Sequence, residues 1–251
     1  MENLQKKIQK SHYASDCISG NYIFQRIYSL MQTIVYFCMC FDHKYYREEM
    51  TFKEIKTIIK NKTVGIAGAG GLGSNCAVAL ARVGIGKLIV CDFDVITRDN
   101  LNRQYYFFEQ VGQKKAFALG DNILFINPNV TVEAHTVKLN PEKIIRIFKD
   151  CDVIVEAFDQ AEMKQMIIET VLENMPETPL VTGIGMAGWG DNASIVWKKI
   201  DNLYICGDGK TEIAENCPPL APRVGIVAHM QANTVLEILL NKHMNNEYHS
   251  Q

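Results

Sequence analysis

A glycine-rich turn directly after an apolar run constrains the fold of this chain more than any other feature. The stretch VGIAGAGGLGSN, residues 64–75, places Gly68, Gly70 and Gly73 in a G-x-G-x-x-G pattern between a predicted strand and a predicted helix. The first glycine permits the sharp bend, the second lets the backbone approach a phosphate, and the third lets helix and strand pack closely. About twenty residues further on, Asp92 ends the next apolar run, where a carboxylate binds ribose hydroxyls. The pattern predicts a nucleotide-binding α/β domain.

The segments on either side of this turn alternate between strand-like and helix-like patterns. Apolar runs such as KTVGIA, KLIVCDF and CDVIVEAF are separated by amphipathic stretches that begin or end at glycine or proline. This alternation predicts a doubly wound, Rossmann-like, mostly parallel sheet with helices on both faces. We expect NASIVWKKI and NLYICG to add antiparallel strands at one edge. Residues 1–49 are aromatic, cysteine-bearing and free of proline, and we interpret them as an N-terminal helical extension to a domain at residues 50–251.

Composition narrows the class of protein. The 251 residues include 26 Lys and Arg and 28 Asp and Glu, a net charge of -2. This charge gives no electrostatic case for nucleic acid or an anionic membrane as the main partner. The apolar run YSLMQTIVYFCMCF at residues 28–41 is shorter than the roughly 20 residues that span a bilayer. The N-terminus is polar, unlike a signal peptide, and the eight cysteines form no disulfide framework. We therefore expect a cytoplasmic protein with reduced thiols.

A glycine-rich turn of this kind also occurs in NAD-dependent oxidoreductases, but a second stretch of the sequence argues against that class. DFDVITRDNLNRQYY puts Asn100 and Arg103 in the loop that follows Asp92, and VGQKK ends with Lys115 shortly afterwards. An NAD-dependent oxidoreductase has no need of these cations, whereas an enzyme that cleaves a triphosphate must stabilise the leaving pyrophosphate. In EAFDQAEMK, Asp159 follows the fourth predicted strand and can reach the same crevice. A lone carboxylate there suits Mg²⁺, which takes its other ligands from phosphate and water.

Taken in order, the stretches GAGGLGS, DFDVITRDNLNRQYY, VGQKK, EAFD and LAPRVGI resemble the ThiF/MoeB family, the bacterial relatives of ubiquitin-activating enzymes. The resemblance covers roughly residues 50–242 and is greatest to the short ThiF-type sulfur carrier adenylyltransferases of anaerobic bacteria. It implies a homodimeric enzyme that uses ATP and Mg²⁺ to adenylate the C-terminal glycine of a ThiS-like, ubiquitin-fold sulfur carrier in thiamine thiazole synthesis.

The resemblance also implies roles for single residues. The turn glycines would hold the ATP phosphates, Asp92 the ribose and Asp159 the Mg²⁺. Asn100, Arg103 and Lys115 would contact the phosphates while the carrier carboxylate attacks the α-phosphorus, a step that needs positioning and charge neutralisation because a carboxylate is a poor nucleophile toward phosphorus. The turn glycines are Gly68, Gly70, Gly71 and Gly73.

Cysteines differ from the family pattern in two ways. Longer members carry two C-x-x-C pairs for structural zinc, but here the corresponding place reads YICGD. Cys206 and Cys217 cannot fill four ligand positions, so we expect no zinc site. In longer members a cysteine near the position of Cys217 forms a covalent link to the activated carrier. Cys217 is therefore a candidate for sulfur transfer, and the alternative is a loop cysteine without such a role.

Three further departures concern single positions and the N-terminus. Gln160 stands where the family usually has asparagine after the magnesium-binding aspartate. Many members contribute an arginine across a dimer interface, and here only Arg26 and Arg47 precede the glycine turn. Residues 1–49 have no counterpart that we can place; a lineage-specific extension and a misassigned start upstream of Met50 are both hypotheses for them.

Three other functions stay open as alternatives. The first is an adenylating enzyme of the same fold that acts on a tRNA base or a peptide, and the near-neutral charge argues mildly against tRNA. The second is a protein that binds a nucleotide or carrier without turnover, which the set of Asp92, Arg103, Lys115 and Asp159 disfavours. The third is the NAD-dependent oxidoreductase, which the cations on the phosphate side disfavour.

Overall fold

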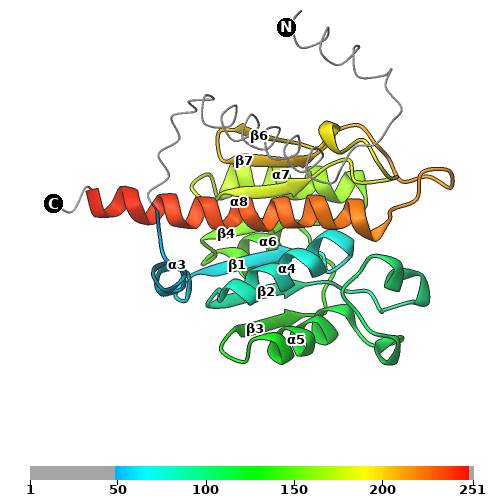
Figure 1. Ribbon diagram of the computed structural model, residues 1–251, viewed down its shortest axis with the longest axis horizontal. Coiled ribbons are helices and arrows are strands. Elements are labelled where there is room, and N and C mark those ends of the chain that lie inside the picture. The colour runs from blue at the N-terminus through cyan, green and yellow to red at the C-terminus, as the bar shows by residue number, and fades with distance from the viewer. Residues whose placement is uncertain (1–48, 249–251) are drawn as a thin grey trace, which may run out of the picture. The chain divides into compact units, whose positions relative to one another are not determined.

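A computed structural model describes residues 49–248 (Figure 1). The expected helical extension at residues 1–49, with Arg26 and Arg47, lies outside the described residues except for Glu49. In the described part of the chain, no helix combines the length and the apolar character needed to cross a membrane. The described region is the one for which the glycine-rich turn predicts a nucleotide-binding fold.

Within residues 49–248, seven strands form one sheet in the order β3-β2-β1-β4-β5-β7-β6. β1 pairs in parallel with β2 on one side and β4 on the other, and β5 continues the parallel part. β7 joins β5 in parallel, and only the β6–β7 hairpin is antiparallel. The predicted Rossmann-like sheet is confirmed, with antiparallel pairing confined to that edge. The strands are β1 (Thr63–Ala67), β2 (Lys87–Cys91), β3 (Thr131–His135), β4 (Val153–Glu156), β5 (Leu180–Gly183), β6 (Val196–Ile200) and β7 (Leu203–Gly207).

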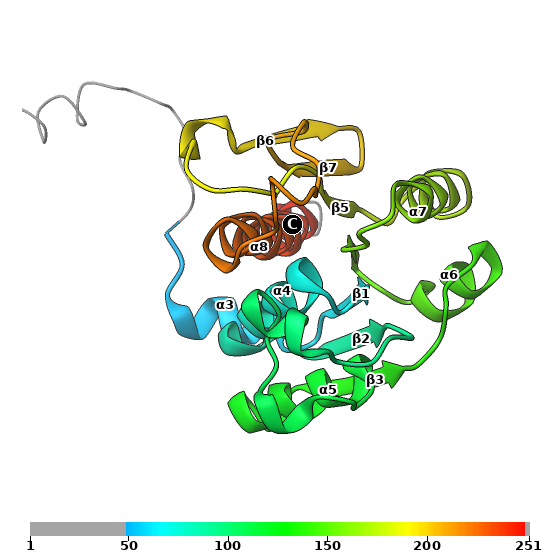
Figure 2. The ribbon, with the colours of Figure 1, turned by 90° about the vertical axis from the view of Figure 1, so that its right-hand side faces the viewer.

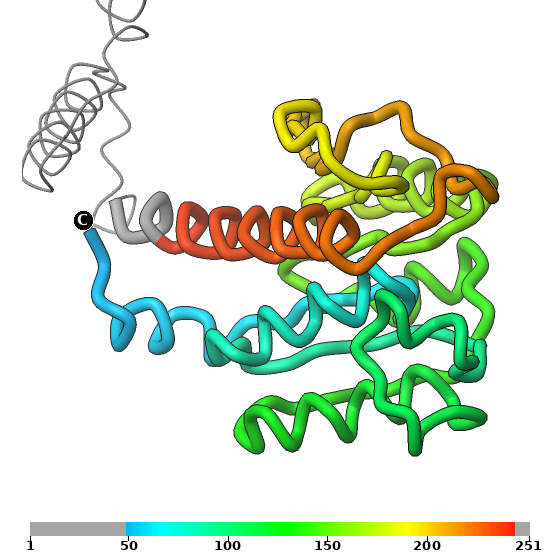
Figure 3. Tube along the Cα trace, turned by 45° about the vertical axis from the view of Figure 1, so that its right-hand side comes forward, coloured from blue at the N-terminus to red at the C-terminus, as the bar shows by residue number. Residues whose placement is uncertain are grey.

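Helices cover both faces of the sheet, as Figure 2 shows. α3, α4, α5 and α8 lie on one face, and α6 and α7 lie on the other. The long α8 runs alongside α4 (Figure 3), and these two helices make the most extensive contact between elements. The helices are α3 (Phe52–Ile59), α4 (Gly71–Val83), α5 (Lys115–Ile126), α6 (Pro141–Phe148), α7 (Ala161–Asn174) and α8 (Ala221–Tyr248).

Capping residues explain where several helices begin and end. Thr51 and Glu54 form a reciprocal capping box at the start of α3. The Asn140 side chain caps α6, and Pro141 occupies its first turn, where a missing N–H costs nothing. α4 ends at Gly84 with a φ of 96°, the left-handed conformation in which glycine commonly caps a helix. These local signals set the alternation that builds the sheet.

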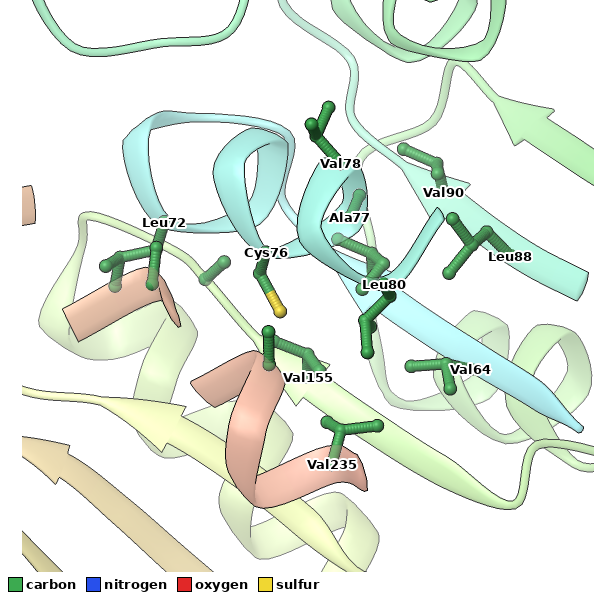
Figure 4. Packing of buried hydrophobic residues seen from close by; sticks show 14 of the residues in the cluster. Val64, Leu72, Cys76, Ala77, Val78, Leu80, Leu88, Val90, Val155 and Val235 are labelled. Carbon is green, nitrogen blue, oxygen red and sulfur yellow. The ribbon is translucent and has the colours of Figure 1, made fainter. Parts of the chain in front are cut away.

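The contact between α4 and α8 is the centre of the core on its face of the sheet (Figure 4). Leu72, Cys76 and Leu80 of α4 pack with Val155 of β4 and Val235 of α8, and all five are buried. Burial raises the pKa of the Cys76 thiol well above its ordinary value, so this cysteine acts as a small apolar residue. Burying apolar side chains of this size contributes roughly 1.5–3 kcal/mol each.

Candidate active site

A pocket of about 250 Å³ opens at the carboxyl ends of β1, β2 and β4. β1 lies between β2 and β4, so the chain departs to one side of β1 and later returns to the other. This is the switch point of a doubly wound sheet, where ligands of such sheets bind. The wall contains seven of the ten predicted site residues: Gly68, Gly70, Gly71, Asp92, Arg103, Lys115 and Asp159.

The turn after β1 has a geometry that side chains would obstruct. Gly68 adopts a φ of 100°, in the left-handed region that favours glycine. At Gly73, an added Cβ would lie 1.8 Å from the carbonyl oxygen of Gly68. Helix α4 therefore reaches the turn only because this position is glycine. Gly73 allows α4 to pack closely against the turn, but it does not itself line the pocket.

Helix α4 presents an uncapped N-terminus to the pocket. Gly70 is its N-cap residue and makes no side-chain capping bond. Gly70, Gly71 and Leu72 all line the pocket. The first amides of a helix have no intrahelical partners and carry partial positive charge, so this end of α4 favours an anionic group such as a phosphate.

Asp92, directly after β2, is held by two backbone amides. Its Oδ2 accepts a hydrogen bond from Ala69 N at 2.7 Å, and its Oδ1 accepts one from Asp94 N at 2.8 Å. Burial raises the pKa of the Asp92 carboxyl, against the opposing effect of these two amides. Each carboxylate oxygen can accept a further bond, so Asp92 keeps capacity for ribose hydroxyls.

Lys115 is the buried cation of the pocket. It is 6 % exposed, begins α5, and places Nζ 2.8 Å from Asp94 Oδ2. Asp94 is exposed and lines the same pocket. Coulomb interactions strengthen where water is excluded, so a buried ammonium is well suited to neutralise phosphate charge.

Arg103 lines the same pocket as Lys115 and is half-buried. Its Nη1 donates to the Asp99 carbonyl at 3.0 Å and to Asn102 Oδ1 at 2.7 Å. Its aliphatic part runs close to Gly71, where a Cβ would lie 3.6 Å from Arg103 Cγ. Within the described residues, Nε and Nη2 make no hydrogen bond. Within the part of the chain that the structure describes, no protein group competes with a ligand for these donors.

Asp159 follows β4 on the other side of the switch point. It is exposed, lines the pocket, and has no hydrogen-bond or ion-pair partner within residues 49–248. Gln160, the N-cap residue of α7, lines the pocket beside it. A carboxylate without a protein partner can hold a cation that also binds phosphate oxygens.

Two further predicted site residues, like Gly73, lie outside the pocket wall. Asn100 is in the short 3₁₀ helix η2 (Arg98–Asn102), and its Oδ1 accepts a bond from Thr97 N at 3.1 Å. Its side chain therefore caps the loop that carries Arg103. Cys217 is half-buried beside Gly188, whose amide donates to the Pro218 carbonyl at 2.9 Å. Both predicted roles, phosphate contact and sulfur transfer, stay predictions.

We expect iodoacetamide to modify Cys217 well before the other cysteines that the structure describes. Burial raises the pKa of Cys91 and Cys151 to about 12 and that of Cys206 to about 11, so these thiols carry almost no thiolate at pH 8. Peptide mass spectrometry after a brief reaction measures the order. Cys217→Ser is the control for peptide assignment, and modification of Cys206 before Cys217 would contradict the arrangement.

Several pocket residues were not predicted. Gln104 is buried in the wall close to Gly70, and its Oε1 has no hydrogen-bond partner in the described residues. Its only sequence signal is its place beside Arg103. Phe158, Met163 and Met186 supply apolar wall. Apolar residues after a strand are usually core, so their sequence carries no sign of this role.

A buried ion pair stands next to the pocket wall. Glu156, fully buried at the end of β4, receives Lys164 Nζ at 2.9 Å on both carboxylate oxygens. Thr182 also donates to it, and Phe158 N donates at 2.6 Å. Lys164 Nζ reaches the Gly183 carbonyl at 2.8 Å as well. The pair thus joins β4, β5 and α7 where Phe158 enters the pocket.

A second buried ion pair holds the loop that carries Cys217. Arg223, in the first turn of α8, places Nη2 2.7 Å from Asp208 Oδ2 and donates through Nη1 to the Gly190 carbonyl. Burial opposes ionisation of Asp208, but hydrogen bonds from Thr211, Lys210 and Arg223 hold the pKa of its carboxyl well below the usual range. The pair ties both ends of the 208–222 loop together.

Comparison with known proteins identifies the family of this chain. Residues 46–251 match the profile of the ThiF family. Adenylyltransferase and sulfurtransferase MOCS3 of Caenorhabditis briggsae is 35% identical over 189 residues, which cover 72% of this chain and 46% of the relative. Probable adenylyltransferase/sulfurtransferase MoeZ of Mycobacterium tuberculosis is 32% identical over 141 residues, which cover 56% of this chain and 35% of the relative. The chain spans less than half the length of these relatives.

Solved structures share the fold. Escherichia coli tRNA N6-threonylcarbamoyladenosine dehydratase TcdA, in complex with AMP, has a TM-score of 0.70 at 20% identity, covering 76% of this chain and 90% of that chain. E. coli MccB with ATP has a TM-score of 0.57 at 22% identity, covering 74% and 57%. The structures bear on the fold alone at these identities, whereas the family match extends over most of the sequence. As its ordered motifs predict, the chain belongs to the ThiF family.

Proposed function

We propose that this protein catalyses the ATP-dependent adenylation of the C-terminal glycine of a ThiS-like sulfur carrier, with release of pyrophosphate. One observation carries the proposal. A single pocket combines an uncapped helix N-terminus, the buried Lys115, the half-buried Arg103 and the carboxylate of Asp92. These groups match the phosphates and the ribose of a nucleoside triphosphate.

For this reaction the pocket must position the carrier carboxylate and the ATP triphosphate, and it must stabilise the pyrophosphate that leaves. A carrier carboxylate oxygen forms a bond to the α-phosphorus while the bond from that phosphorus to the bridging oxygen of pyrophosphate breaks. Lys115 and Arg103 would neutralise charge on the phosphates as pyrophosphate leaves. Asp92 would fix the ribose, and the turn glycines would let the backbone amides approach the phosphates. No general base is required, because the attacking carboxylate is already ionised.

The residues also fit Mg²⁺. Asp159 offers a carboxylate without a protein partner in the described residues, next to the space for the phosphates. Mg²⁺ takes one or two carboxylates and completes its octahedron with phosphate oxygens and water. The ion would supply charge neutralisation to the triphosphate. Asp159 would hold the Mg²⁺ ion. Gln160, at the position where the family usually has asparagine, would lie beside it.

The names of the relatives favour an adenylyltransferase but differ in the acceptor. Curated relatives such as MOCS3 and MoeZ are named adenylyltransferases, others are named ubiquitin-like modifier-activating enzyme 5, and solved structures of E. coli TcdA hold AMP and ATP. TcdA itself is a tRNA-modifying enzyme by name, so a tRNA base remains the alternative acceptor. The near-neutral charge of this chain supports a carrier protein over tRNA.

The wider context is part of the same proposal. Residues 50–251 would form the adenylation domain, with residues 1–49 as an N-terminal extension. The enzyme would act as a cytoplasmic homodimer in thiamine thiazole synthesis, without zinc. Family resemblance supports the homodimer and the pathway.

ATP–pyrophosphate exchange tests the proposal. We expect exchange by the purified full chain to require both Mg²⁺ and a carrier that ends in Gly-Gly. Arg103→Ala should lower the exchange rate by about 10- to 100-fold, the loss typical of a hydrogen bond to a charged group. Arg98→Ala is the matched control, since Arg98 lies in the same loop over the Phe108 ring and outside the pocket. Tight ATP binding without carrier-dependent exchange would reject this acceptor.

A further inference from the structure

A closed ring of hydrogen bonds joins three elements of the pocket: the glycine turn after β1, the loop after β2 and the start of α5. On one side, Asp92 accepts from Ala69 N at 2.7 Å and from Asp94 N at 2.8 Å. Asp94 in turn accepts from Lys115 Nζ at 2.8 Å. Tyr106 completes the ring, because its hydroxyl lies 2.8 Å from the Ala69 carbonyl and 3.2 Å from the Lys115 carbonyl.

Tyr106 is the only side chain of the ring that bridges the glycine turn and α5. The residue is 7 % exposed, and burial raises the pKa of its phenol, so it stays a neutral donor at any physiological pH. Both of its partners are carbonyl oxygens, so one proton is shared between two acceptors. Lys115 N also donates to the Asp94 carbonyl at 3.0 Å, so Tyr106 supplies the direct link between the turn that carries Ala69 and the helix that carries Lys115, and the loop after β2 supplies the indirect one.

The two sides of the ring face different parts of the proposed nucleotide. Asp92 would bind the ribose, and Lys115 would bind the phosphates. A ligand that contacts both sides depends on the distance between them, whereas a ligand that contacts one side does not. Position errors near 1 Å can cost about a hundredfold in rate, so a bond that fixes this distance affects catalysis without touching the substrate.

We infer that Tyr106 is a positioning residue for the proposed adenylation, acting through Ala69 and Lys115 to hold the ribose and phosphate sites at a fixed spacing. This inference rests on the proposed function. The amino-acid sequence alone does not point to Tyr106, since nothing in RQYYF distinguishes it from the neighbouring Tyr105.

The test compares two phenylalanine variants at neighbouring positions. Tyr106→Phe keeps the buried ring and removes the hydroxyl. Tyr105→Phe removes a hydroxyl that accepts from Arg82 at 3.2 Å on the exposed side. We expect Tyr106→Phe to weaken ATP binding roughly tenfold, the effect of one hydrogen bond, with adenosine and pyrophosphate binding unchanged. Tyr105→Phe should leave all three unchanged.

A double variant and a melting curve decide between positioning and general stability. If Tyr106 acts through Lys115, Tyr106→Phe should weaken ATP binding no further in a Lys115→Ala background. A loss of the same size for adenosine and ATP, or a lower melting temperature with unchanged ATP affinity, would overturn the inference. These binding measurements need no carrier, so the absence of carrier-dependent exchange would reject the proposed acceptor without affecting the positioning role of Tyr106. A wild-type chain that binds no ATP would overturn both.

Discussion

Replacement of Lys115 by alanine is expected to lower carrier-dependent ATP–pyrophosphate exchange by about 10²- to 10³-fold, the loss typical of removing one preorganised group that stabilises developing charge. The effect should exceed that of Arg103→Ala because the two cations differ in burial. Lys115 is 6 % exposed, whereas Arg103 is half-buried and partly screened by water. Stability should change little, since the partner Asp94 is exposed and is solvated when the ammonium is lost.

Lys114 provides the matched control for this measurement. It adjoins Lys115 but is exposed, lies outside the pocket wall, and donates to the Phe93 carbonyl at 2.9 Å. Lys114→Ala should change exchange by no more than about twofold, as surface substitutions usually do. Equal losses in the two variants would show that general positive charge, and not the buried ammonium, drives the rate. Unchanged exchange in Lys115→Ala would remove this lysine from the proposed mechanism.

Order and type of the secondary-structure elements could be predicted because their signals are local. Pro141 and Gly84 mark a helix start and a helix end within a few residues, and the glycine pattern at Gly68 to Gly73 requires a strand before it and a helix after it. The pairing of β7 with β5 was not predictable in the same way. Either strand of the β6–β7 hairpin can dock on β5, and the choice depends on packing by residues far away in the sequence.

The residues of the candidate site also fall into those that local sequence signals reveal and those that depend on the folded structure. Motif spacing brought out Asp92, Arg103, Lys115 and Asp159, since each follows a strand or a turn that ends at the switch point. Asn100 shows the limit of that reasoning. It belongs to the right loop, but the 3₁₀ turn directs its side-chain oxygen to Thr97 N. Whether a loop side chain faces a ligand or caps its own backbone depends on dihedral angles that spacing does not reveal.

Buried networks were the part least accessible from sequence. Glu156 appears in EAFD as one more residue of an apolar strand, and the side-chain partners of its carboxylate, Lys164 and Thr182, lie 8 and 26 residues away in the chain. Such contacts exist only after the sheet and α7 have assembled. Their physical consequence is large, because a carboxylate with no exposed surface depends entirely on its partners.

Lys164→Met is therefore expected to lower the free energy of unfolding by roughly 3–5 kcal/mol, the usual cost of leaving a buried charge without its partner. Methionine fills a similar volume but supplies no proton to Glu156, whose side chain is fully buried. For a domain of this size the melting temperature should fall by roughly 6–20 °C. Calorimetry and urea denaturation of the full chain at pH 7.5 measure both quantities.

An exposed ion pair provides a control that shows whether burial or short distance makes the loss of Lys164 costly to stability. Lys87 and Glu133 lie closer, at 2.6 Å, but their side chains are 37% and 43% exposed. Lys87→Met should therefore cost about 1 kcal/mol or less. Adding Glu156→Gln to Lys164→Met should recover part of the lost stability, because an unpaired amide is cheaper to bury than an unpaired carboxylate. Equal costs for Lys87→Met and Lys164→Met would mean that distance alone sets the value of these pairs. No recovery in the double variant would mean that Lys164 stabilises through its bond to the Gly183 carbonyl and its packing, and not through Glu156.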